Sequence, residues 1–193
     1  MRTIKKVASH IFIDGFGGMT QGLFATLIIG TMIQQIGLLI GGSTGNVIYL
    51  LGKAAAALTS AGIGVGVAVK YGESPLVTVS AAVAAMVGGY AGKITGGTFF
   101  VDGNAVLAGP GEPLGAFIAA FAGITCGHLV SGKTKVDIIV TPVITIGAGS
   151  VVGLLVGPPI SQMMTGLGSI INWQRNSGRS SWASLFRSSW VWF

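Results

Sequence analysis

Long apolar runs alternate with short polar or glycine-rich segments along most of this chain. Each run is roughly 18–23 residues long, which is the length that a helix needs to cross the hydrocarbon core of a bilayer. We therefore expect an all-α polytopic membrane protein with about five transmembrane helices. The expected spans cover about residues 22–41, 47–69, 75–92, 113–131 and 137–157.

Two segments of the chain do not fit this pattern of simple spans. In residues 1–21, Asp14 and Gln21 interrupt the apolar core that a cleaved signal peptide would need. We predict an N-terminal interfacial amphipathic helix there. Residues 93–112 are apolar enough to enter the bilayer but too rich in glycine to cross it as one helix. We expect a re-entrant or broken-helix segment there, lining a polar cavity.

The composition supports a membrane protein and excludes several functional classes. Of the 193 residues, 51% are hydrophobic and only 8% are charged, whereas soluble domains carry about 25% charged residues. The 33 glycines favour a channel or carrier, because glycine permits close helix packing and broken helices. The net charge of +6 does not indicate nucleic-acid binding, because the basic residues form no patch. The single cysteine and the two histidines are scattered and no catalytic or nucleotide-binding motif occurs, so we expect no metal, no cofactor and no enzymatic activity.

The distribution of lysine and arginine predicts the orientation in the membrane. With a cytoplasmic N-terminus, the loops 70–74 and 132–135 are also cytoplasmic, and this side then carries most of the basic residues. These are Arg2, Lys5, Lys6, Lys70, Lys133 and Lys135. The outer segments hold only Lys93, and Lys53 lies within a span.

Residues 174–193 differ from the rest of the chain. They hold three arginines, six serines and three of the four tryptophans, but no acid. An interfacial helix would suit the tryptophan and arginine residues. A frameshift explains the abrupt change better, because one back-translation with a restored base encodes another apolar segment. We therefore predict that residues 1–173 are the N-terminal part of a longer membrane-embedded domain and that residues 174–193 are an aberrant tail.

A few polar residues are candidates for substrate contacts, because ionisable groups within a membrane are costly. Glu112 directly precedes Pro113, which is well tolerated in the first turn of a helix. A carboxylate at this start of the fourth span can accept hydrogen bonds from two hydroxyls of a polyol; an acid in an outer loop is the alternative. His128, near the end of the same span, is either a ligand or an interfacial histidine, and Glu73 is expected to be a solvated loop charge. The predicted substrate-binding residues are Glu112, Asn104, His128 and Asp102.

Three long stretches of the sequence carry a family resemblance. They are "HIFIDGFGGMTQGLFATLIIGTMIQQIG", "GIGVGVAVKYGESPLVTVSAAVAAMVGGYAG" and "GPGEPLGAFIAAFAG". Together they resemble the membrane-embedded C subunit (EIIC) of bacterial phosphotransferase-system sugar permeases, in a branch that includes toxin-gene regulators. Better-studied permeases of this system carry a Gly-x-x-Glu-Pro motif whose glutamate binds sugar hydroxyls. "GPGEP", residues 109–113, is similar to that motif, so the resemblance implies this role for Glu112.

The resemblance implies a sugar or polyol permease in the bacterial inner membrane, working by alternating access with separate cytoplasmic A and B subunits. We also expect a homodimer embedded in the lipid bilayer. A membrane sensor without transport is a competing hypothesis. A third hypothesis is an ion-coupled carrier of another small solute, for which Glu112 would be the titrating group.

Overall fold

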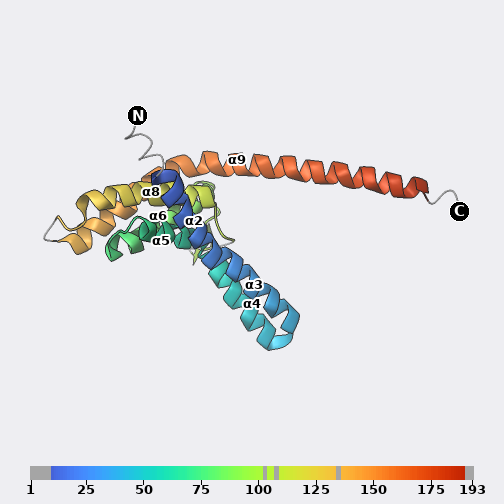
Figure 1. Cartoon of the computed structure of the whole chain (residues 1–193), viewed down its shortest axis with the longest axis horizontal. Helices are drawn as coiled ribbons and strands as arrows, with labels where there is room; N and C mark the ends of the chain where they lie inside the picture. Colours follow the sequence, from blue (N-terminus) through green and yellow to red (C-terminus); the bar gives the residue numbers. More distant parts are fainter. Residues whose placement is uncertain (1–9, 102–103, 107–108, 134–135, 190–193) are drawn as a thin grey trace. The chain divides into compact units, whose positions relative to one another are not determined.

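The computed structural model describes residues 10–101, 104–106, 109–133 and 136–189 (Figure 1). The chain divides into two compact units, Met1–Pro158 and Pro159–Phe193, and each is described by itself. Helices dominate the described residues, which confirms the expected all-α architecture. In chain order the elements are η1 (His10–Gly15, a π-helix), α2 (Phe16–Leu23), η2 (Phe24–Ile28, a π-helix), α3 (Ile29–Ile40), α4 (Gly42–Ala57), α5 (Thr59–Lys70), α6 (Pro75–Gly89), α7 (Ala91–Thr95), β1 (Phe100–Val101), β2 (Asn104–Ala105), α8 (Pro113–Val130) and α9 (Asp137–Ser189).

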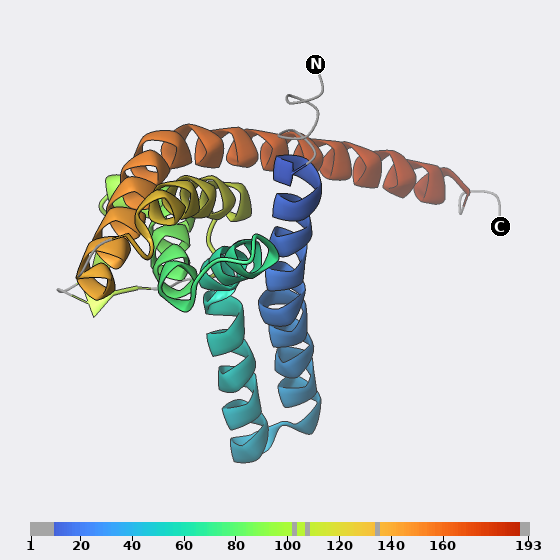
Figure 2. The ribbon, with the colours of Figure 1, turned by 60° about the vertical axis from the view of Figure 1, so that its left-hand side comes forward.

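The first four elements follow one another without a gap and form one continuous rod (Figure 2). Within it, Ile13–Ile40 is an apolar helix of 28 residues, about 42 Å long at a rise of 1.5 Å per residue. The helix has no break at residue 21, where the sequence predicts the boundary between an interfacial helix and the first span, and the interfacial position of its first turns stays a prediction. Residues 10–21 continue directly into the span, and residues 1–9 lie outside the described residues.

The second expected span is a bent pair of helices. The axes of α4 and α5 differ by 52° at a break on Leu58. The Thr59 hydroxyl donates to the Ala56 carbonyl at 2.7 Å, and the Tyr90 hydroxyl lies 3.1 Å from the Ala57 carbonyl oxygen. Two hydroxyl groups thus lie against backbone carbonyls at the break, and polar groups of this kind favour a broken helix inside a membrane. A broken helix is present as expected, but its place is Leu58 rather than residues 93–112.

A ladder of glycines joins the first rod to the bent pair. A Cβ atom built on any of these glycines would lie within 3.0 Å of backbone or side-chain atoms across the interface. The pairs are Gly18 with Gly66, Gly22 with Gly62, Gly30 with Gly52, and Gly37 with Gly45. The backbones therefore meet in direct contact along the whole rod, as in membrane helix pairs built on small residues.

The remaining apolar helices pack around α5. Helices α6 and α8 are neighbours, with Gly88 against Gly115, and the first half of α9 joins them through Gly149 and Gly153. The buried core between α5, α6 and α8 contains Ile63, Val67, Val77, Phe117 and Ile124, among others. Large apolar side chains on α3, α4 and α9 are instead exposed, as expected for surfaces that face lipid.

These helices coincide with the five apolar runs of the sequence. Ile13–Ile40, Pro113–Val130 and Asp137–Ser169 are each long and apolar enough to cross a membrane, and the bent pair α4–α5 is a fourth candidate. Helix α6 is apolar but only 15 residues long, about 22 Å, which is shorter than a hydrocarbon core of about 30 Å.

The segment 93–112 is irregular, as expected, but its described part is not a re-entrant helix. After the short helix α7, the strands β1 and β2 form an antiparallel pair that aligns Phe100 with Ala105 and Val101 with Asn104.

In the second unit, the described residues all belong to α9, which passes residue 173 without a break. The backbone does not mark the boundary expected there, and the origin of the tail stays a prediction.

Candidate functional site

The site is built on the turn "GPGEP", residues 109–113, which leads into α8. Gly109 and Gly111 have φ angles of +82° and +76°, in the left-handed region that favours glycine. Pro110 between them restricts the turn further. Glu112 is extended at the N-cap of α8, and Pro113 occupies the first turn. The structure thus confirms the predicted position of Glu112 at the start of this helix.

Buried groups from two helix ends hold this turn in place. The Glu112 N–H donates to the carbonyl oxygen of Gly89 at the end of α6, at 2.7 Å. The Ser60 hydroxyl, in the first turn of α5, donates to the Pro110 carbonyl at 2.9 Å. The Tyr90 hydroxyl donates to the Gly109 carbonyl. The turn is therefore fastened at the break between α4 and α5 and at the break between α6 and α7.

Glu112 is part-buried beside these breaks. It makes no capping hydrogen bond to α8. In the described part of the chain it also has no ion pair. The N-terminal end of α8 favours its negative charge through the helix dipole. This carboxylate can therefore accept hydrogen bonds from a bound molecule.

Two further residues predicted to bind substrate, Asn104 and Asp102, belong to the segment before the turn. Asn104 lies on the exposed strand β2. Asp102 lies outside the described residues. Their roles as substrate ligands stay predictions.

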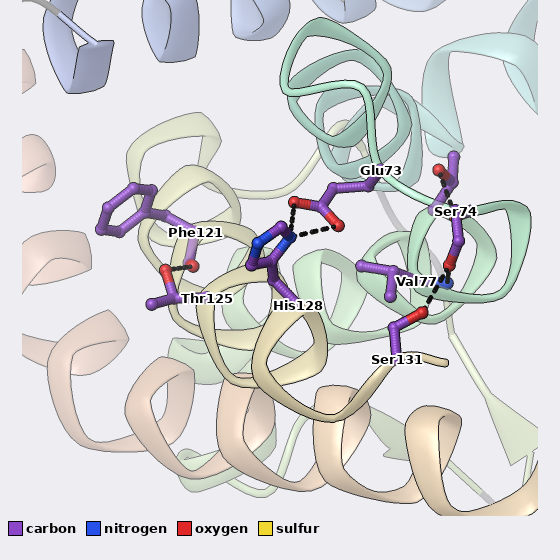
Figure 3. A network of polar contacts seen from close by, with 8 residues as sticks. Glu73, Ser74, Val77, Phe121, Thr125, His128 and Ser131 are labelled. Carbon is purple, nitrogen blue, oxygen red and sulfur yellow. Dashed lines mark hydrogen bonds and ion pairs between the residues drawn. The ribbon is translucent and has the colours of Figure 1, made fainter. Parts of the chain in front are cut away.

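His128 lies at the opposite end of α8 from Glu112. The two residues are separated by 16 positions, or about 24 Å along a helix, so one small molecule cannot contact both. His128 Nδ1 instead pairs with the carboxylate of Glu73, at 3.0 Å from Oε1 (Figure 3). The Ser74 and Ser131 hydroxyls meet at 3.1 Å in the same region. These contacts join the loop after α5 to the end of α8.

The Glu73 side chain is only 9% exposed, whereas the His128 side chain is 71% exposed. The expectation that Glu73 is a solvated loop charge is therefore wrong.

The surroundings of Tyr71, in the same loop, change the pKa of its phenol. Its burial, together with the negative charge of Asp14, raises the pKa of its phenol above the usual range.

The comparisons with known proteins decide the family. The family described as "Phosphotransferase system, EIIC" matches residues 13–177, which is most of the chain. The chain belongs to this EIIC family. No curated protein and no solved structure matches it.

As an EIIC protein, the chain is a membrane-embedded permease subunit of a phosphotransferase system. Its match ends within the tail that the sequence sets apart at residue 174. The match also places the GPGEP turn and all of α2–α8 inside the family domain.

Ser60 and Tyr90 are not among the site residues that the sequence of this EIIC chain predicts. Both are buried, at 0% and 1% exposure. Both lie at breaks in helices, and both reach a turn far away in the sequence. No local motif marks them, since serine and tyrosine are ordinary constituents of membrane helices.

We expect the Glu73–His128 pair to contribute modestly to stability. In a double-mutant cycle of Glu73→Gln and His128→Gln, the coupling should be about 1 kcal/mol or less, because the histidine is largely exposed to solvent. Thermal unfolding of the purified protein in detergent at pH 6 measures this coupling. A coupling of several kcal/mol would contradict the view that water screens this pair.

Proposed function

We propose that this EIIC protein carries a sugar or related polyol across the membrane, with the Glu112 carboxylate accepting hydrogen bonds from the substrate's hydroxyl groups. The observation that supports this role most directly is that the Glu112 side chain has no hydrogen-bonding partner among the described residues. The residue follows a turn that is bonded to the break between α4 and α5 and to the break between α6 and α7. A carboxylate offers two acceptor oxygens, which suits a pair of neighbouring hydroxyls.

The depth of the site supports a transport role. Gly30 packs on Ala56, just before the break at Leu58, and Gly62 packs on Thr26, just after it. The break is therefore level with residues 26–30, near the centre of the helix Ile13–Ile40. If that helix crosses the whole bilayer, the break at Leu58 lies near the midplane, where carriers place their substrates between broken helices.

The cycle that we propose is alternating access. The N-terminus is cytoplasmic, and separate cytoplasmic A and B subunits supply the phosphoryl group that the sugar receives. Two copies of the chain form a homodimer. The family match supports a phosphotransferase permease subunit over a sensor without transport.

The decisive experiment is equilibrium binding of radiolabelled hexoses, hexitols and disaccharides to the full chain purified in detergent. Glu112→Gln should weaken binding of the best substrate roughly 10- to 100-fold, because a hydrogen bond to a charged group contributes about 1.5–3 kcal/mol. Glu73→Gln, at the far end of α8, is the matched control and should leave binding within about twofold of the wild type.

Two results would contradict the proposal. Equal binding by the wild type and by Glu112→Gln would remove this residue from the substrate site. Failure of the wild-type chain to bind any sugar or polyol in the panel would count against a permease and in favour of a sensor.

A further inference from the structure

Two buried hydroxyl groups converge on the GPGEP turn from different helices. Ser60 comes from the start of α5 and Tyr90 from the end of α6. They donate to neighbouring carbonyls, Ser60 to Pro110 and Tyr90 to Gly109. The next bond in this series is from the Glu112 N–H to the Gly89 carbonyl. Three of the four backbone residues from Gly109 to Glu112 thus form a hydrogen bond with α5, with Tyr90 or with the end of α6.

The bond made by Ser60 differs from those of most other hydroxyls on the described helices. A serine or threonine in a helix usually bonds to the carbonyl three or four residues earlier. Such bonds are made by Thr20, Thr26, Thr31, Thr59, Thr78, Ser80, Thr95, Thr125, Thr145, Thr165 and Ser169. Ser60 instead reaches a carbonyl 50 positions away in the sequence. Its hydroxyl therefore serves the turn and not its own helix.

The turn has little room to move between these partners. A Cβ atom on Gly111 would lie 2.5 Å from the Ser60 hydroxyl oxygen and 3.0 Å from the Gly89 carbonyl oxygen. The Tyr90 hydroxyl also lies 3.1 Å from the Ala57 carbonyl oxygen, directly before the break at Leu58. Any change in the bend between α4 and α5 therefore acts on the same groups that hold the turn.

We propose that Ser60 and Tyr90 are positioning residues for Glu112. Their hydroxyls fasten the GPGEP turn to the two helix breaks and so fix the place of the Glu112 carboxylate. What that carboxylate does for a substrate rests on the proposed function. Its fixed position rests only on the contacts described above.

The position of residue 112 can be tested without any substrate. The native thiol is removed by Cys126→Ser and a new one is introduced by Glu112→Cys. The rate at which the new thiol reacts with a water-soluble, negatively charged methanethiosulfonate reports its surroundings. The rate is measured on monodisperse full-length protein in detergent, alone and combined with Ser60→Ala or Tyr90→Phe. Each of these two changes removes a single oxygen atom.

We expect Ser60→Ala and Tyr90→Phe each to change the reaction rate by at least about fivefold, because the turn is released. Ser80→Ala is the matched control for serine, since Ser80 is also buried but bonds only to Leu76 of its own helix. Tyr71→Phe, at the other end of α5, is the control for tyrosine. Both controls should stay within about twofold of the parent. Equal rates in all of these proteins, including no reaction in any of them, would overturn the proposal.

Sugar binding to chains that retain Glu112 separates the two proposals. Tyr90→Phe and Ser60→Ala should weaken binding of the best substrate by roughly 3- to 30-fold, and Ser80→Ala should not weaken it. If Glu112→Gln leaves binding unchanged while the thiol rates still respond to Ser60 and Tyr90, the proposed function fails and the positioning role stands. If the thiol rates do not respond, the positioning role fails whatever the binding shows.

Discussion

Replacing Gly22 with alanine is expected to destabilise the protein by about 1–3 kcal/mol, the usual cost of overpacking a tight interface. A Cβ atom there would lie 2.5 Å from the carbonyl carbon of Gly62 and 2.7 Å from the nitrogen of Ile63. These are backbone atoms, so no side-chain rotation can relieve the overlap. The rod and α5 must separate instead. The midpoint of thermal unfolding, measured in detergent as the monodisperse fraction after heating, should fall by several degrees.

Gly17 provides the matched control on the same helix. Within the part of the chain that the structure describes, the only atom within 4 Å of a Cβ built there is Cε of the flexible Lys70 side chain, at 3.8 Å. Gly17→Ala should therefore stabilise the helix by up to about 1 kcal/mol, because alanine favours the helical backbone over glycine. Equal shifts for the two substitutions would show that the glycine ladder does not hold the rod against α5.

The glycine content of the sequence predicts close helix packing, but it cannot identify which glycines meet. The apolar runs predict the helices, because the length of an apolar segment is a local property of the chain. The bend at Leu58 is different. The surrounding residues include no proline, and one of the hydroxyls beside the bend comes from Tyr90, 33 positions from Ala57. Such a long-range contact leaves no trace in the local pattern.

The difference between local properties and long-range contacts also explains which parts of the site could be predicted from the sequence. Glu112 could be placed at a helix start from Pro113 alone, since proline suits the first turn. The partners of the turn before Glu112 could not be foreseen, because Ser60 and Tyr90 come from helices that precede the turn by many residues. The interpretation of Glu73 failed for a related reason. A loop charge is usually solvated, but this one is covered by packing and joined to His128 of another helix.

The two glycines of the GPGEP turn allow a direct test of how closely the site is packed. Gly109 and Gly111 both have positive φ angles, so alanine at either position should cost about 1–2 kcal/mol in backbone strain. Only Gly111 is also crowded. Among the described residues, a Cβ on Gly109 would meet no atom within 4 Å, whereas one on Gly111 would press on Ser60 and Gly89. The comparison therefore isolates the effect of crowding from that of strain.

We expect Gly111→Ala to weaken substrate binding by at least about tenfold, because the displaced turn carries Glu112 with it and overpacking adds about 1–3 kcal/mol to the strain. Gly109→Ala should weaken binding by less than about threefold. Both are measured by equilibrium binding of the best radiolabelled sugar to the purified chain. Because the Ser60 hydroxyl is the nearest obstacle, the double variant Ser60→Ala/Gly111→Ala should lose less binding energy than the sum of its two single variants. Equal losses for Gly109→Ala and Gly111→Ala, or strict additivity in the double variant, would mean that contact with Ser60 does not set the position of Glu112.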